Sequence, residues 1–187
     1  MLVVIALVAA FEAVHQFSAL VGNNSKDELS RYLDDNQHST ASPSGAGFKV
    51  DFPVPATRLS EQFQTGSLTM PVPRDDALVD GEVTFDAIWL TLPGNAPPNQ
   101  TRYLSSLVGL QIRQLGGTKI GTVGARRIGG ALARDVAFSV VDRAGVKRYF
   151  DERIFLKGRK IWVLRVGSRI RRDAAFQAFV HSFAFKS

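Results

Sequence analysis

From residue 47 onward, apolar and polar residues alternate in short runs that are interrupted by Gly and Pro, a pattern typical of strands joined by turns. Apolar residues spaced three and four apart predict helices over 101–115, with Thr101 as N-cap, and over 171–183. Strands joined by short turns pair antiparallel, because a parallel pair needs a longer crossover. The sequence therefore predicts an α+β domain, an antiparallel β-sheet packed by two helices. The predicted strands are 48–52, 58–72, 82–92, 119–128, 132–141, 147–156 and 161–166.

The hydrophobic pattern divides the chain into three parts. Residues 1–22 are predominantly apolar, and the 21 residues from Leu2 to Gly22 are long enough, as one helix, to cross a hydrocarbon core of about 30 Å. Residues 23–46 are polar and become rich in Ser, Pro and Gly, which predicts a flexible linker, with a helical turn or two over 26–33. Residues 47–187 are predicted to form the folded domain.

Three interpretations of residues 1–22 remain open. The segment is an uncleaved membrane anchor, which we favour, a cleavable secretion signal, or an amphipathic or buried helix of a soluble protein. A secretion signal normally carries basic residues before its apolar run, and none are present here. The anchor predicts a single-pass membrane protein with an extracytoplasmic domain. Lys26 and Arg31 conflict with that orientation, because the positive-inside rule places them on the cytoplasmic side.

Glu12 and His15 are unusual in an apolar segment and fall on one face of the predicted helix. A charged side chain at the centre of a bilayer costs about 3 kcal/mol on insertion scales. A neighbouring helix would shield the pair, so we expect Glu12 and His15 to contact another membrane protein.

Charge is distributed unevenly along the chain. Residues 1–95 contain 5 Lys and Arg against 12 Asp and Glu, a balance of −7, whereas residues 96–187 contain 18 against 5, a balance of +13. Such asymmetry is found in proteins that bind nucleic acid, anionic lipid or acidic partners, but it also arises from polar residues on exposed strands. Binding of nucleic acid calls for exposed aromatic residues interleaved with the basic ones, as in an RNA-recognition sheet, and the sequence contains no RNA-recognition motif, so no nucleic acid is expected.

The basic residues are densest in the last predicted hairpin. We predict that this hairpin contacts a protein partner or anionic lipid headgroups, with Arg153 and Arg165 pointing outward, away from the helices. The candidate contact residues in the hairpin are Arg148, Arg153, Lys157, Arg159, Lys160 and Arg165.

Candidate catalytic chemistry is sparse. The absence of Cys excludes disulfides, thiol catalysis, iron–sulfur clusters and Cys-ligated zinc. The predicted domain has one histidine, His181, which is expected to be a partly buried structural residue. The acidic pairs 34–35 and 75–76 lack a third metal ligand, and the Gly-rich stretch 116–130 lacks a phosphate-loop motif. We therefore predict no catalytic residue, no metal and no cofactor.

The order of predicted elements and several local motifs resemble the Mog1/PsbP-like superfamily. The motifs are Gly-Phe-Lys-Val-Asp-Phe-Pro at 47–53, Arg-Ile-Phe-Leu at 153–156, Ile-Trp-Val-Leu-Arg-Val at 161–166 and the segment 176–183. The resemblance covers residues 47–185. The superfamily includes PsbP, Mog1 and exported bacterial proteins of the LpqN type, which implies an accessory or binding domain without established catalysis.

These observations support two functional hypotheses. The first is a non-catalytic, membrane-anchored bacterial accessory protein, a small subunit that docks on a larger membrane protein complex. The alternative is an exported carrier that binds a lipid or a small apolar ligand between sheet and helices, with Trp89 and Trp162 in the lining.

Overall fold

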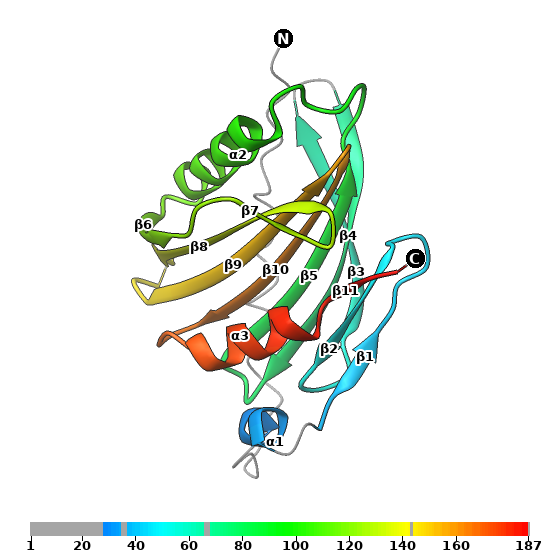
Figure 1. The fold of residues 1–187 in the computed structure, drawn as a ribbon. Coiled ribbons are helices and arrows are strands. Elements are labelled where there is room, and N and C mark those ends of the chain that lie inside the picture. Colours follow the sequence, from blue (N-terminus) through cyan, green and yellow to red (C-terminus); the bar gives the residue numbers. More distant parts are fainter. Residues whose placement is uncertain (1–27, 35–36, 66–67, 143, 187) are drawn as a thin grey trace.

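The computed structural model describes residues 28–34, 37–65, 68–142 and 144–186. The described elements follow the order strands, helix, strands, helix, preceded by one short helix (Figure 1). They are α1 (Glu28–Asp34), β1 (Ser39–Ala41), β2 (Phe48–Phe52), β3 (Thr57–Thr65), β4 (Leu68–Val79), β5 (Val83–Thr91), α2 (Gln100–Gln114), β6 (Thr118–Thr122), β7 (Arg126–Ile128), β8 (Ala131–Val141), β9 (Lys147–Lys157), β10 (Lys160–Ser168), α3 (Asp173–Ser182) and β11 (Ala184–Phe185).

Two antiparallel sheets organise the fold. The large sheet has the strand order β3-β4-β5-β10-β9-β8-β6, and β7 pairs with β8 beside this path. The small sheet has the order β1-β2-β11. The predicted α+β class with an antiparallel sheet is confirmed.

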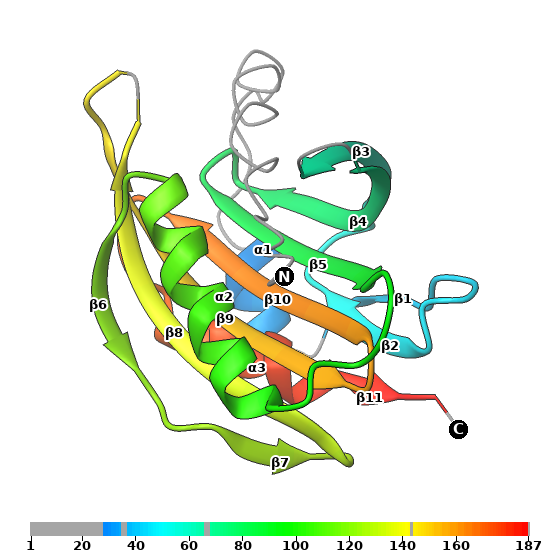
Figure 2. The ribbon, with the colours of Figure 1, turned by 90° about the horizontal axis from the view of Figure 1, so that it is seen from above.

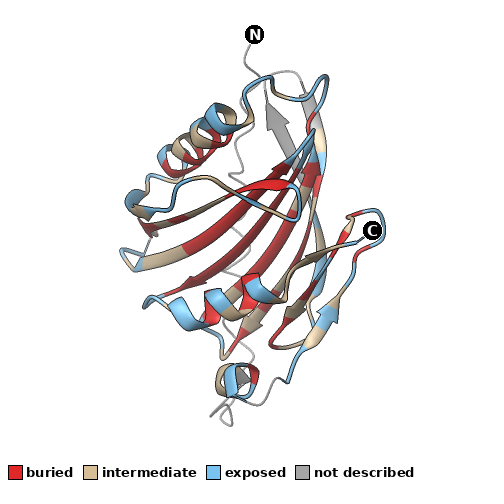
Figure 3. Ribbon diagram, viewed as in Figure 1, coloured by how far each residue is buried: buried red, intermediate tan, exposed pale blue. Residues whose placement is uncertain are grey.

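The large sheet is covered on both faces. Helix α2 lies on one face, and α3 with the small sheet lies on the other (Figure 2). Two apolar clusters fill these layers, one around Leu104 and Phe138 below α2, the other around Phe52 and Phe179 below α3. Residues 161–168 of the central strand β10 are all buried in consequence, as the red strands in Figure 3 illustrate.

Several predicted boundaries were wrong. The segment 58–72, predicted as one strand, is divided between β3 and β4, which pair with each other. The segment 119–128 is divided between β6 and β7, which both pair with β8. The N-cap of α2 is Asn99, whose side-chain oxygen accepts a hydrogen bond from the Arg102 N–H at 2.9 Å, and not Thr101.

The prediction that residues 23–46 form a flexible linker fails for its described part. This part contains α1 and β1, and β1 pairs with β2. The Tyr32 ring is 6% exposed and packs edge-on against Phe85, with ring centroids 5.8 Å apart. Ala46 is also buried in the core. The helical turns expected over 26–33 correspond to α1, but the polar composition gave no indication that its single aromatic side chain inserts into the core.

We expect Tyr32→Phe to lower the free energy of unfolding by about 1 kcal/mol, because the Tyr32 hydroxyl donates a hydrogen bond to the Asp51 carbonyl at 3.1 Å and the ring is retained. Urea denaturation of the full chain measures this change. A stability equal to the original protein's would show that α1 does not dock as described.

The predicted hydrophobic helix over 1–22 lies outside the described residues. Among the helices that the structure does describe, none has both the length and the apolar character needed to cross a membrane.

Candidate functional site

The β9–β10 turn presents basic residues at one end of the large sheet. Lys157 and Lys160 are cross-strand partners on either side of a two-residue turn. Gly158, the first turn residue, has φ 60°, a left-handed conformation that type II′ turns require and that glycine adopts without strain. The Arg159 guanidinium donates a hydrogen bond to the Gly94 carbonyl at 2.9 Å, which fixes the turn against the loop after β5.

A shallow pocket of about 430 Å³ opens beside this turn. Its cationic lining consists of Lys157, Arg159, Lys160 and Lys186. Thr91, Gly47, Trp162 and Phe185 complete the wall and floor. We call this feature the basic pocket. Its four cationic side chains belong to exposed residues, and no ion pair joins any of them to a carboxylate within the described ranges.

The aromatic floor of the basic pocket is held rigidly. The Trp162 indole N–H donates to the Ala46 carbonyl at 2.8 Å, and its ring meets Phe185 edge-on at 5.0 Å. Phe185 lies against Gly129, where an added Cβ would approach the ring to 2.7 Å. The close approach requires glycine, so chain segments far apart in sequence fix the position of this ring.

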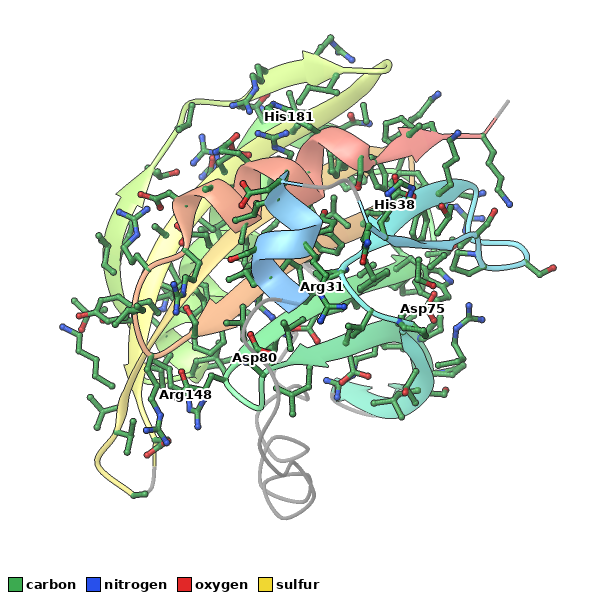
Figure 4. All side chains as sticks on the ribbon, turned by 90° about the horizontal axis from the view of Figure 1, so that it is seen from below. Arg31, His38, Asp75, Asp80, Arg148 and His181 are labelled. Atoms are coloured by element: carbon green, nitrogen blue, oxygen red, sulfur yellow. The ribbon has the colours of Figure 1, made fainter. Side chains whose placement is uncertain are left out.

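The predicted contact residues do not all meet. Lys157, Arg159 and Lys160 line the basic pocket as one group. Arg148 lies at the opposite end of β9, near the β8–β9 turn (Figure 4), where its Nε is 3.3 Å from an Asp142 carboxylate oxygen. Glu12 and His15 lie outside the described residues.

The prediction that Arg153 points outward is wrong. Arg153 is 5% exposed and lies on the sheet face that carries α3, where it donates to both carboxylate oxygens of Asp135, at 2.6 and 2.8 Å. Burial raises the pKa of Asp135, but hydrogen bonds from Arg153 and Arg126 outweigh that effect and hold the pKa below its ordinary value. Arg153 is thus a structural ion-pair partner.

The prediction for Arg165 is also wrong. Arg165 is 3% exposed and lies on the face that carries α2. Its guanidinium nitrogens lie 2.9 Å from Asp86 and 3.5 Å from Glu152, the residues opposite it on β5 and β9. Because helices cover both faces of the sheet, neither face offers Arg153 or Arg165 an outward direction.

Burial alters the protonation of Glu152. Its side chain is inaccessible to solvent, and this burial raises its pKa to about 7, against the opposing effect of Arg165. The Gln111 side-chain amide on α2 donates to one carboxylate oxygen of Glu152 at 3.0 Å. The other oxygen has no hydrogen-bond partner in the described part of the chain. With a pKa of about 7, Glu152 exchanges its proton near neutral pH, where an ordinary glutamate is ionised.

One of the four cationic pocket residues was missed from the sequence. Lys186 follows β11, and its backbone N–H donates to the Gly47 carbonyl at 3.0 Å, which brings the chain end to the β9–β10 turn. No spacing rule connects residue 186 with residues 157–160. The resemblance covered residues up to 185, and the chain end offered no other signal.

The described residues suggest no catalytic group. His181 is exposed on α3 (Figure 4), so the expectation that it is partly buried was wrong. Within the described ranges, no three His, Asp or Glu side chains gather in a way that could hold a metal ion. The basic pocket supplies positive charge and an aromatic surface, which suits binding of an anion.

Comparison with known proteins supports the fold. No family model matches the chain, and no curated protein matches it in sequence. The solution structure of cyanobacterial PsbP (CyanoP) from Synechocystis sp. PCC 6803 superposes with a TM-score of 0.57 at 13% identity, covering 79% of this chain and 92% of that one. A protein of unknown function from Pseudomonas aeruginosa gives a TM-score of 0.41 at 10% identity, covering 70% and 82% of the two chains. The chain therefore has a PsbP-like fold, as its sequence motifs predicted.

Proposed function

We propose that this chain is a non-catalytic accessory protein, held at a membrane by its N-terminal hydrophobic segment, that docks on a larger membrane protein complex. The observation that carries the proposal is the basic pocket, where four exposed cationic residues gather without a carboxylate partner among the described residues. The PsbP-like fold is consistent with it, because accessory and binding domains use this fold.

The distribution of ion pairs supports a binding role for the β9–β10 turn. Seven other arginines of the described chain form ion pairs with Asp or Glu side chains: Arg58, Arg74, Arg126, Arg148, Arg153, Arg165 and Arg171. Among the described residues, no carboxylate neutralises the positive charge at the basic pocket in this way. Exposed charge of one sign favours association with surfaces of opposite charge.

Co-purification from gently solubilised membranes tests the proposal. The tagged full chain is compared with a version that begins at Asn23, and bound proteins are identified by mass spectrometry. This truncation retains α1 and β1, whereas a start at Ala46 would delete both elements from the fold. We expect a defined set of membrane proteins with the full chain and fewer with the truncated chain.

A charge-reversal pair separates the pocket from general electrostatics. Lys157→Glu with Lys160→Glu alters the basic pocket, while Lys119→Glu with Lys147→Glu makes the same change in net charge at exposed sites elsewhere. Only the Lys157→Glu, Lys160→Glu variant is expected to lose the partner protein. Recovery of no partner by the full chain, or recovery of a stoichiometric lipid in place of protein, would contradict the proposal and favour the carrier alternative.

A further inference from the structure

The basic pocket contains a row of side chains that brings two like charges together. Thr91, Lys160 and Lys157 face one another across β5, β10 and β9, so their side chains lie on the same face of the sheet. Like charges directly opposite on neighbouring strands repel, and this pair is not relieved by a described carboxylate. An anion placed between the two ammonium groups would remove that repulsion.

The charge comes from two separate parts of the chain. Lys157, Arg159 and Lys160 belong to the β9–β10 turn, whereas Lys186 is brought in behind β11. The cations therefore border a pocket of about 430 Å³ and do not converge from one turn on one point. A ligand with several separate negative groups matches this arrangement better than a single small anion does.

The apolar part of the pocket is formed before any ligand arrives. Phe185 is fixed by Gly129 and Trp162, and the Lys157 ammonium lies 5.8 Å from the centre of the Phe185 ring, within cation–π range. A preorganised floor lowers the entropic cost of binding, because these aromatic side chains are already ordered.

The pocket lies at the far end of the strands from α1. Tyr32 of α1 contacts Phe85, while Thr91 of the pocket stands six residues further along β5, a separation of about 20 Å at the rise of a strand. The described chain enters the fold at α1 (Figure 1). A chain tethered to a membrane through its N-terminal side therefore presents the pocket away from that tether, which favours a protein ligand over membrane headgroups.

We infer that the basic pocket is the docking site for an acidic segment of the partner protein, whose Asp or Glu carboxylates pair with Lys157, Lys160 and Lys186 while an adjoining apolar side chain covers Phe185. This inference deepens the proposed function and rests on it.

Binding of a defined probe tests the inference. The full chain is kept in a non-ionic detergent. The probe is a fluorescein-labelled peptide of six consecutive glutamates and one C-terminal phenylalanine, and its binding is measured by fluorescence anisotropy. We expect saturable binding that weakens as NaCl rises from about 50 to 500 mM, because exposed pairs are screened. The Lys157→Glu, Lys160→Glu variant should bind at least about tenfold more weakly.

The Lys119→Glu, Lys147→Glu variant is the matched control and should bind within about twofold of the original chain once salt screens distant charges. Equal binding of the peptide to both double variants would overturn the inference, because the positive charge as a whole, and not the pocket, would be responsible. Far-UV circular dichroism of both variants establishes that each is folded.

Two further binding experiments distinguish an acidic peptide from a lipid headgroup and from a small phosphate ligand. Vesicles containing phosphatidylglycerol that bind through Lys157 and Lys160, when the peptide does not, would overturn the inference in favour of a lipid headgroup. Pyrophosphate that displaces the peptide and binds more tightly would overturn it in favour of a small phosphate ligand. Peptide binding without any recovered membrane partner would instead count against the proposed function, so the two failures are distinguishable.

Discussion

Arg165→Ala is expected to lower the free energy of unfolding by about 3–5 kcal/mol, among the largest effects of any single substitution in this chain. Arg165 is buried between Asp86 and Glu152, which are 6% and 0% exposed. Removing the guanidinium leaves two carboxyl groups in a water-excluded layer without their shared cation. Breaking a buried ion pair from one side is costly because the remaining charge cannot be solvated.

Urea denaturation at pH 7, monitored by tryptophan fluorescence, measures this loss. Arg169→Ala is the matched control: Arg169 is exposed, and its loss should alter stability by no more than about 0.5 kcal/mol. Arg165→Met keeps most of the aliphatic stem while removing the charge, so it should be nearly as unstable as Arg165→Ala. A methionine variant as stable as the original protein would show that the ion pairs add nothing to stability.

Glu152→Gln is expected to remove a pH dependence of stability that the original protein shows between about pH 4.5 and 7. The pKa of Glu152 is about 7 in the folded state and near its ordinary value of 4.5 in the unfolded state. The folded protein therefore holds a proton that the unfolded chain has released. The contribution of Glu152 to the free energy of unfolding is therefore largest below pH 4.5. This contribution, on the order of 3 kcal/mol, is lost as the pH rises through 7.

Denaturation of both proteins at a series of pH values isolates this contribution, because the other carboxyl groups titrate in both. We expect the difference in unfolding free energy, Glu152→Gln minus original, to increase with pH up to about 7 and then to remain constant. Glutamine retains an acceptor for the Gln111 side-chain amide, so packing against α2 is preserved. A difference that is independent of pH would mean that the pKa of Glu152 is the same in the folded and the unfolded state.

Both predictions concern residues that sequence patterns describe poorly. Arg165 stands in the run 161–166 between apolar residues, and the expected outward direction followed from its charge. In the structure Arg165 lies below α2, opposite two acidic residues from other strands. Lys157, Lys160 and Arg159 were assigned correctly to the exposed hairpin because turn residues cannot be covered by either layer.

The linker shows a different limit of sequence reasoning. Residues 28–46 are short in apolar side chains, and composition alone predicts a tether. Tyr32 and Ala46 nevertheless occupy the core, because the layer below α3 has space that these two side chains fill. Whether a weakly apolar segment folds depends on a surface contributed by other parts of the chain.

The pattern of apolar residues and turns along the chain was sufficient to establish the antiparallel α+β class, both longer helices and the hairpin of β9 and β10, because these depend on periodicity and on neighbours in sequence. Local motifs and the order of elements were sufficient to indicate the likeness to PsbP. Tertiary structure alone decided that α2 and α3 cover opposite faces, that Arg153 and Arg165 are buried, and that Lys186 joins the β9–β10 turn in one basic pocket. These features depend on contacts between residues up to 139 positions apart, as between Gly47 and Lys186, and the pattern of a single sequence carries no record of which distant segments will meet.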